Sequence, residues 1–382
     1  THERGVYKVV IRTRNEGIGR LAIESARDLV MAAINDRPYD VGAAIARLTD
    51  MVDRQCLGPS TACIVDAAVE RGIPWIRLND GNLVQLGHGA AQHRIWTAET
   101  DRTSAIAEGI ARDKDLTKRL LSAAGVPVPE GRTVESAEAA WDAAEDIGLP
   151  VAVKPLDGNH ARGVSLNLKT REEVMAAFVA AEKEGSDVLV ERFIPGEEHR
   201  LLVVGGKVVA ATRGEIIRVN GDGRSTIAHL ITTGVNTDPR RGEEEQFPLD
   251  VIRLDDPILL LLLQRQALSP DSVLPRGESA VVQRTGNMAN DVTGLVHPDI
   301  AEQMALAARV VGLDIAGIDL VVEDISQPLG PQGGAIVEVN AGPGLLMHLK
   351  PAVGRAQPVG EAIVDHLFPA NASGRVPIVG VI

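Results

Sequence analysis

The sequence predicts an α/β protein whose functional groups lie on a pair of neighbouring strands near the C-terminal end. Residues 317–323 and 335–340 are apolar runs rich in branched side chains, a pattern typical of buried strands. A turn rich in proline and glycine, 327–334, separates them. Elsewhere, segments with helical spacing, such as 18–35, alternate with further short apolar runs, so helices and strands are mixed along the chain.

Length and composition favour a globular protein of two or three domains. The chain has 382 residues, which is long for a single core, and 45% of them are hydrophobic. Aromatic residues make up only 2%, so we expect a core of Val, Ile, Leu and Ala. A net charge of −13 argues against nucleic acid or an anionic membrane as the partner. The leucine run 259–263 is far shorter than the roughly 20 residues of a membrane span.

The cysteines and the chain ends indicate a cytoplasmic piece of a longer protein. Cys56 and Cys63 form neither a zinc pattern nor a disulfide framework, so a reducing cytoplasm is the simplest setting. No signal peptide is visible, and the first residue is Thr1, so we expect an excised segment.

Residues 1–103 are expected to form a first α/β unit. Its predicted elements are helices at 18–35, at 38–54 and from 57 onward, and strands at 73–78 and 83–87. Ser60 or Thr61 is the expected N-cap of the third helix. We interpret the polar and aromatic side chains that follow as surface or interface groups, in preference to a metal or nucleotide site: His88, His93, Arg94 and Trp96.

Asp319, Glu338 and Asn340 are the polar interruptions in the strand pair. Glu338 and Asn340 are two residues apart, so their side chains leave the same face of the strand. Oxygen ligands that converge on one face suit Mg²⁺, which prefers carboxylates together with nucleotide phosphates. The loop that follows contains Gly342 and Gly344, whose amides can approach an anionic substrate. On residue types alone, the alternative is a hairpin with an acidic rim.

A lysine and a glycine-bounded loop predict a second set of phosphate contacts. Lys154 closes the predicted strand 149–155, and the loop 156–164 follows it. Backbone amides of such a loop can wrap around a triphosphate, although hairpins use the same glycine chemistry. The Walker pattern G-x-x-x-x-G-K-[ST] is absent from the sequence, so a nucleotide would be held in another way.

The order of these residues resembles that of the ATP-grasp ligases. The matching positions are Lys154-Pro155, Glu191, Glu198, Asp319, Glu338 and Asn340. The resemblance implies an ATP-grasp fold, ATP and Mg²⁺ as cofactors, and a metal held by Asp319, Glu338 and Asn340. It implies that ATP is bound by Lys114, Lys154, Gly158, His160, Gly163, Glu191, Arg192, Phe193 and Glu198. Within that set, the backbone of 191–193 would read adenine and Glu198 would bind ribose.

A polar insertion makes the chain similar to one branch of these ligases, the cyanophycin synthetase family. The segments that carry the similarity are 57–61, 83–87, 218–230 and 236–242, and it extends over essentially the whole chain. Read alone, the insertion is a polar subdomain with turn signals at both ends. The resemblance implies the C-terminal part of an N-terminal domain at 1–103, an ATP-grasp domain at 104–370 with a lid at 148–190 and the insertion at 215–280, and a lead-in to a Mur-ligase-like domain at 371–382.

That resemblance implies ATP-dependent addition of L-aspartate to the C-terminus of an aspartate–arginine polymer, cyanophycin, through an acyl phosphate. Arginine addition would belong to the Mur-like domain, so its site is expected to be absent here. Phosphoryl transfer depends on positioning and charge neutralisation, so the expected catalytic groups are cations: Arg284, Lys154 and Arg200. The implied substrate-binding residues are Arg162, Arg213, Asn287, Gly342 and Gly344. Family members assemble as homo-oligomers, commonly tetramers.

One departure and two alternatives accompany this interpretation. Relatives carry a longer Ser/Thr/Gly-rich loop where this chain has 288–293, so the contacts to polymer are unassigned. A relative that joins preformed β-aspartyl-arginine units is one alternative. A nucleotide-binding module without catalysis is the other, and the complete set of predicted metal ligands argues against it.

Overall fold

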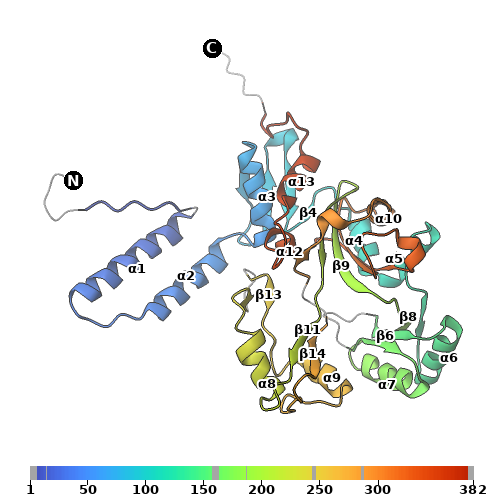
Figure 1. Ribbon diagram of the computed structural model, residues 1–382. Helices are drawn as coiled ribbons and strands as arrows, with labels where there is room; N and C mark the ends of the chain where they lie inside the picture. The colour runs from blue at the N-terminus through green and yellow to red at the C-terminus, as the bar shows by residue number, and fades with distance from the viewer. Residues whose placement is uncertain are drawn as a thin grey trace.

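The fold is a mixed α/β arrangement around a central antiparallel sheet (Figure 1). The computed structural model describes residues 7–13, 15–156, 163–185, 187–242, 247–284 and 288–376. The central sheet has five strands in the order β15-β10-β9-β16-β17. Their bounds are β9 (Glu197–Val204), β10 (Lys207–Arg213), β15 (Asn290–Asp291), β16 (Ile315–Val322) and β17 (Ala335–Asn340). The α/β class expected from the sequence is confirmed.

Alternation along β9 explains how the central sheet is buried on both faces. Helices α10 (Pro298–Val311) and α13 (Val359–Leu367) pack against it, and α3 (Pro59–Glu70) packs against α13. Leu201 and Val203 point to the side of α10 and join its core cluster. Leu202 and Val204 point to the other side and join the cluster that contains α3 and α13. The N-terminal half of β9 is polar, so its side chains can contribute to a site.

A second antiparallel sheet lies beside the central one, at the lower right of Figure 1. Its four strands follow the order β5-β8-β6-β7. Their bounds are β5 (Gly131–Val134), β6 (Val151–Pro155), β7 (Ser165–Leu168) and β8 (Val188–Arg192), and α6 (Ala137–Ile147) and α7 (Arg171–Glu182) cover them. We call this unit the lid sheet. A capping box of Thr170 and Glu173 fixes the start of α7.

The insertion forms a small body of its own, at the lower left of Figure 1. Strands β11 (Ile217–Asn220) and β14 (Ser279–Gln283) pair antiparallel, and β12 (Arg241–Gly242) pairs in parallel with β13 (Leu249–Asp250). The helices are α8 (Ile227–Leu230), a π-helical turn at Ile231–Val235 and α9 (Pro257–Arg265), the leucine-rich run. Val219, Leu259 and Leu263 share a separate core. Among the helices in the described part of the chain, none is long and apolar enough to span a bilayer.

The N-terminal region joins an antiparallel sheet to a helical hairpin that stands away from the body in Figure 1. Its elements are α1 (Glu16–Ile34), α2 (Val41–Gln55), β1 (Trp75–Arg77), β2 (Leu83–Leu86), β3 (His93–Trp96) and β4 (Glu99–Thr100). The predicted side-chain cap of α3 is wrong, because its N-cap is Gly58 and no side chain caps it. The hydroxyl of Ser60 instead accepts a hydrogen bond of 3.0 Å from the backbone N–H of Leu345, which ties α3 to the loop after β17.

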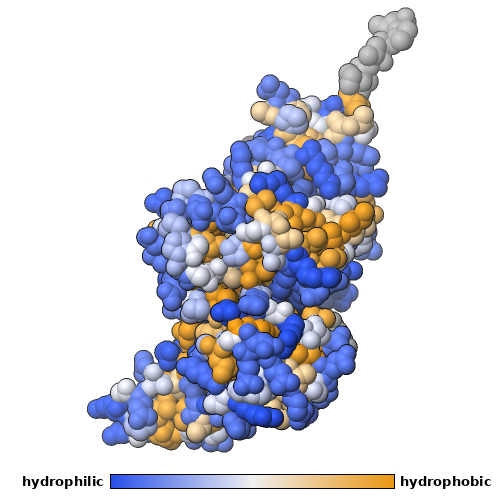
Figure 2. Space-filling view, turned by 90° about the vertical axis from the view of Figure 1, so that its right-hand side faces the viewer, coloured by the Kyte–Doolittle hydropathy of each residue, from blue (hydrophilic) through white to orange (hydrophobic). Residues whose placement is uncertain are grey.

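Short helical elements complete the fold. One face of the molecular surface is shown in Figure 2. Single helical turns occur at η1 (Gly89–Ala91), η3 (Thr293–Leu295), α11 (Leu329–Gln332) and α12 (Leu346–Leu349). On the face in Figure 2, hydrophilic residues cover much of the surface and hydrophobic residues gather across its middle.

Candidate active site

A row of charged side chains crosses three strands of the central sheet. Asp319 on β16 lies opposite Arg200 on β9 and opposite Glu338 on β17. Arg200 donates two hydrogen bonds to the Asp319 carboxylate, one of them from Nη2 to Oδ2 at 2.8 Å. The amide nitrogen of Asn340 lies 3.5 Å from the same Oδ2. The strand register therefore brings together the predicted metal ligands and one predicted catalytic cation.

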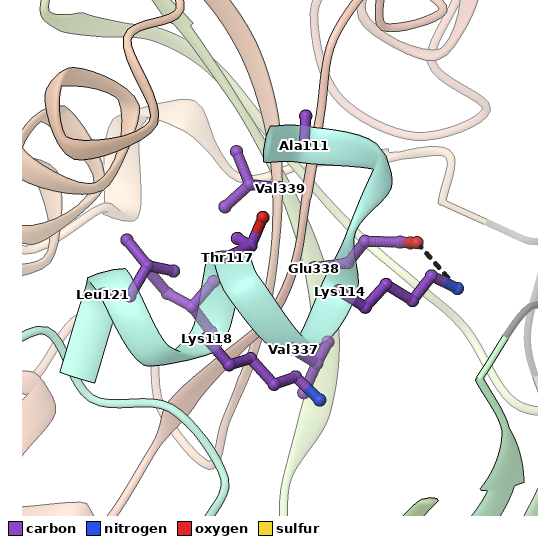
Figure 3. Close-up of a pocket in the computed structure, with 9 residues that line it drawn as sticks. Ala111, Lys114, Thr117, Lys118, Leu121, Val337, Glu338 and Val339 are labelled. Atoms are coloured by element: carbon purple, nitrogen blue, oxygen red, sulfur yellow. Dashed lines mark ion pairs between the residues drawn. The ribbon is translucent and has the colours of Figure 1, made fainter. Parts of the chain in front are cut away.

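The two carboxylates of this row have pKa values shifted in opposite directions. Burial raises the pKa of Asp319, and the Glu338 carboxylate beside it acts in the same direction against Arg200. Burial also acts to raise the pKa of Glu338, but the ammonium of Lys114 together with hydrogen bonds to Asn340 and Asp319 outweighs burial, and the pKa is lowered. The Nζ of Lys114 lies 3.2 Å from Oε1 of Glu338, the ion pair marked in Figure 3.

Helix α5 supplies two amino groups from one of its faces. The elements here are α4 (Ala105–Arg112) and α5 (Lys114–Ala123), and the Asp113 side chain caps α5 by accepting from the N–H of Leu116. Lys114 and Lys118 are four residues apart, so they lie one turn apart, and both extend to the same side in Figure 3. Sequence reasoning missed Lys118, although this spacing was a visible signal.

Glu191, at the end of β8, is a buried carboxylate held by two lysines. The residue is only 3% exposed. Its Oε2 lies 2.7 Å from Nζ of Lys154 on β6, and its Oε1 contacts Nζ of Lys118. The neighbouring Arg192 is committed to the lid sheet, since its Nη2 donates to the carbonyl of Ile147 at 2.7 Å. Phe193, half-buried, follows with its N–H bonded to the Pro150 carbonyl, and adenine recognition by this segment stays a prediction.

Three further predicted site residues, Glu198, Arg284 and Arg213, differ in how deeply they are buried. Glu198 precedes Arg200 by two residues on β9, so it shares the face of the charged row. Burial and then the Asp319 carboxylate raise the pKa of Glu198 to about 7, and Arg284 is one of the cations that oppose this rise. Arg284 is exposed just after β14, within electrostatic reach of Glu198. Arg213 is instead paired with Glu197 at 3.0 Å on the outside.

The structure describes three of the predicted glycines, Gly163, Gly342 and Gly344. Gly342 has a φ of 58°, and a Cβ there would lie 3.0 Å from Cγ of Glu99, so a larger residue would be both strained and crowded. Gly344 borders open space. Gly163, near the end of the loop predicted at 156–164, has a φ of 68°. Four further predicted residues lie outside the described part of the chain: Gly158, His160, Arg162 and Asn287.

A cavity borders the charged row on the side of α4. Its volume is about 270 Å³. The residues that line it are Glu99, Glu108, Ala111, Arg112, Lys114, Glu338, Asn340 and Ala341. Burial raises the pKa of Glu99 on its wall, and Glu108 is paired with Arg112 at 2.6 Å. No motif in the sequence pointed to Glu99, Glu108 or Arg112, because the fold alone brings these three residues to the predicted metal ligands.

The donor set fits a hard divalent cation that is shared with phosphates. Within the described residues, no cluster of three or more His, Cys, Asp or Glu side chains forms a metal site complete in itself. Asp319 and Glu338 supply two carboxylates, and Asn340 supplies an amide oxygen. Mg²⁺ commonly uses one or two carboxylates and takes its other ligands from water and phosphates.

Known proteins similar to this chain share the fold and this site region. Residues 106–203 match the family model of the ATP-grasp domain. The cyanophycin synthetase of Trichormus variabilis is 40% identical over 386 residues, which cover 99% of this chain and 43% of that relative. A bifunctional glutathione biosynthesis protein of Clostridium perfringens is 30% identical over 332 residues, which cover 84% of this chain and 42% of that relative.

A solved structure agrees with the sequence matches. The crystal structure of a bifunctional glutathione synthetase from Pasteurella multocida aligns with a TM-score of 0.59 and 25% identity, covering 85% of this chain and 46% of that one. The chain therefore spans less than half of the length of the relatives that it matches.

Proposed function

Because this chain is an ATP-grasp ligase that matches part of the cyanophycin synthetases over 99% of its length, we propose that it adds L-aspartate to the C-terminus of an aspartate–arginine polymer. ATP with Mg²⁺ is the cofactor pair of ATP-grasp ligases, as the sequence predicted. The observation that carries the proposal is the row of Arg200, Asp319 and Glu338, with Lys114 beside it. In this proposal, the two carboxylates hold a metal and the neighbouring ammonium of Lys114 binds phosphate.

The reaction transfers a phosphoryl group and then an acyl group. The terminal carboxylate of the polymer attacks the γ-phosphate of ATP, which releases ADP and forms an acyl phosphate. The amine of aspartate attacks the acyl carbon, loses a proton and displaces inorganic phosphate, which leaves an amide. No protein nucleophile is needed, since positioning and charge neutralisation supply most of the rate. When bound at Asp319, Glu338 and Asn340, Mg²⁺ would neutralise charge on the phosphates.

The cations of the chain have separate roles in this proposal. Lys114 and Lys154 bind phosphate oxygens, and Arg284 stabilises the charge that develops at the γ-phosphate. Arg200 was expected to act on the phosphate as well, but both of its hydrogen bonds go to Asp319. We therefore assign Arg200 to orienting that carboxylate.

The remaining binding roles follow from the positions of the residues in the sequence. Glu198 binds ribose, and the backbone of 191–193 reads adenine at the C-terminal end of β8. The proposed substrate contacts are those that the resemblance implies: Arg162, Arg213, Asn287, Gly342 and Gly344. The loop around Gly158, His160 and Gly163 closes over the phosphates.

The cavity beside α4 supports an amino-acid substrate. Its wall presents the carboxylates of Glu99 and Glu108 and the guanidinium of Arg112. A free amino acid carries one ammonium and at least one carboxylate, so both charge types find a counterpart there. The cavity borders Glu338 and Asn340, so an amine bound there would lie near the proposed metal site.

We also propose that the chain assembles with copies of itself. Apolar side chains are exposed along the helical hairpin, including Val30 at 56%, Ile34 at 71% and Ile45 at 58%. Exposed apolar surface of this kind suits a protein contact. Light scattering of the purified chain tests the assembly, and a monomer at all concentrations would refute it.

ADP release tests the proposed activity. With ATP, Mg²⁺ and a short primer, ADP release should require L-aspartate and should not respond to arginine. Stimulation by β-aspartyl-arginine and not by aspartate would favour the alternative that preformed dipeptides are joined. ADP release that no amino acid or dipeptide stimulates would leave the nucleotide-binding module as the better account.

A further inference from the structure

The Glu191 carboxylate has both of its oxygens occupied by amino groups. Lys118 contacts Oε1, and Lys154 contacts Oε2 at 2.7 Å. The side chain of Glu191 is 4% exposed, that of Lys118 is 13% exposed and that of Lys154 is 19% exposed. A buried carboxylate held by two donors on opposite oxygens is confined to one orientation.

The three groups come from two structural units. Glu191 and Lys154 lie on the adjacent strands β8 and β6 of the lid sheet, where Ala152 and Leu189 are their direct partners. Their side chains are therefore diagonal neighbours on one face of that sheet. Lys118 lies on α5, whose Leu121 packs into the core cluster of the central sheet. The contact between Lys118 and Glu191 thus connects the lid sheet to the body that carries Asp319 and Glu338.

The arrangement has a chemical consequence for phosphate binding. An ammonium group has three donors, so Lys154 can bond Glu191 with one and a phosphate with the others. A carboxylate held only by Lys154 would draw that amino group away from the phosphates and would also repel them. With Lys118 on the opposite oxygen, Glu191 serves as a fixed anchor for Lys154.

Burial and crowding lower the pKa values of both lysines in the cluster. Burial lowers the pKa of Lys118 to about 6, and the Lys154 amino group beside it adds to the effect. Burial lowers the pKa of Lys154 to about 8. The other charged groups that face the pair are Lys114, which lowers both pKa values, and Glu338, which raises them. An anionic ligand favours the protonated form of such crowded amino groups, so its binding should raise their pKa values.

We propose that Lys118 is a positioning residue for the nucleotide: through Glu191 it holds the Lys154 amino group, and with it the lid sheet, in the orientation that binds the phosphates of ATP. This inference depends on the proposed function only in that the site binds ATP. Lys118 itself need not touch the nucleotide.

The first test compares the nucleotide affinity of two variants of the full chain, each with one basic residue of α5 replaced by methionine. Lys118→Met removes the anchor and keeps the aliphatic stem. Arg119→Met is the matched control, because Arg119 is the next residue of α5, is also a basic residue and has a side chain that is 69% exposed. The dissociation constant of a non-hydrolysable ATP analogue with Mg²⁺ should rise roughly tenfold or more in Lys118→Met, the scale of one charge-assisted contact. It should stay within about twofold in Arg119→Met.

A double-mutant cycle separates positioning from direct contact. If Lys118 acts through Glu191, then adding Lys118→Met to Glu191→Gln should change the dissociation constant by less than about threefold. The double variant also buries no unpaired carboxylate, so it tests the inference even where Lys118→Met fails to fold. An unchanged loss of roughly tenfold in the Glu191→Gln background would show direct contact with phosphate and overturn the inference.

The outcomes distinguish this inference from the proposed function. Failure of the unaltered chain to bind the ATP analogue would refute the proposed function. Normal binding by the unaltered chain and by Lys118→Met would refute only the role of Lys118. Lys118→Arg should recover most of the affinity, because a guanidinium can also donate to Oε1 of Glu191.

Discussion

Replacing Glu338 by glutamine is expected to reduce turnover far more than stability. The substitution keeps the shape of the side chain and removes one anionic group from the proposed metal site. The Glu338 side chain is 33% exposed and its ion pair with Lys114 spans 3.2 Å. Breaking such a partly exposed pair should lower the free energy of unfolding by at most about 1 kcal/mol. For a chain of this size, the melting temperature should then fall by about 4 °C or less.

The expected loss of turnover is much larger. Removing one preorganised electrostatic group from an active site lowers kcat by about 100- to 1,000-fold, or about 2.7–4 kcal/mol. The assay is ADP release at saturating ATP, with aspartate and primer, at several Mg²⁺ concentrations. Because the variant should bind the metal more weakly, raising Mg²⁺ should restore part of the activity.

Glu323→Gln is the matched control for this prediction. Glu323 directly follows β16 and is exposed, so the same chemical change occurs outside the charged row. It should leave both turnover and melting temperature unchanged. Wild-type turnover in Glu338→Gln, or an equal loss in Glu323→Gln, would refute the assignment of Glu338.

Three further predictions concern the lid sheet. Burial lowers the pKa of Lys154 to about 8, and phosphates favour its ammonium form, so ATP binding should take up protons and weaken as the pH rises above about 8. Calorimetry in buffers of different ionisation enthalpy measures this proton uptake, and binding without it would contradict the prediction. Gly131→Ala should lower stability and ATP affinity, because a Cβ there would lie 2.6 Å from Cγ of Glu191, whereas Gly109→Ala meets no atom within 4 Å and is the control for thermal melting. Hydrogen exchange across 151–168 should slow when a non-hydrolysable ATP analogue binds, and unchanged exchange would count against closure of the lid.

Elements with a local sequence signal could be predicted well. The strand expected at 335–340 agrees with β17 residue for residue, and the turn expected at 327–334 lies between β16 and β17. Both follow from alternation and turn chemistry within a few residues. The same local reasoning placed Asp319 and Glu338 on neighbouring strands, which their direct pairing confirms.

Features that depend on distant segments could not be predicted in the same way. Nothing local to β9 specifies that Arg200 lies opposite Asp319, since pairing of separate strands is set by the packed core. The cap predicted at Ser60 failed because its hydroxyl serves Leu345 across the fold. Lys118 had a visible helical spacing, but its partner Glu191 belongs to another sheet.

Mass spectrometry of the extended primer tests the proposed function most directly. The chain is supplied with ATP, Mg²⁺, an aspartate–arginine primer and either aspartate, arginine or β-aspartyl-arginine. The proposal predicts a product that is heavier by one aspartate residue, in the presence of aspartate and whether or not arginine is added. Incorporation of arginine, or extension by the dipeptide and not by aspartate, would contradict it.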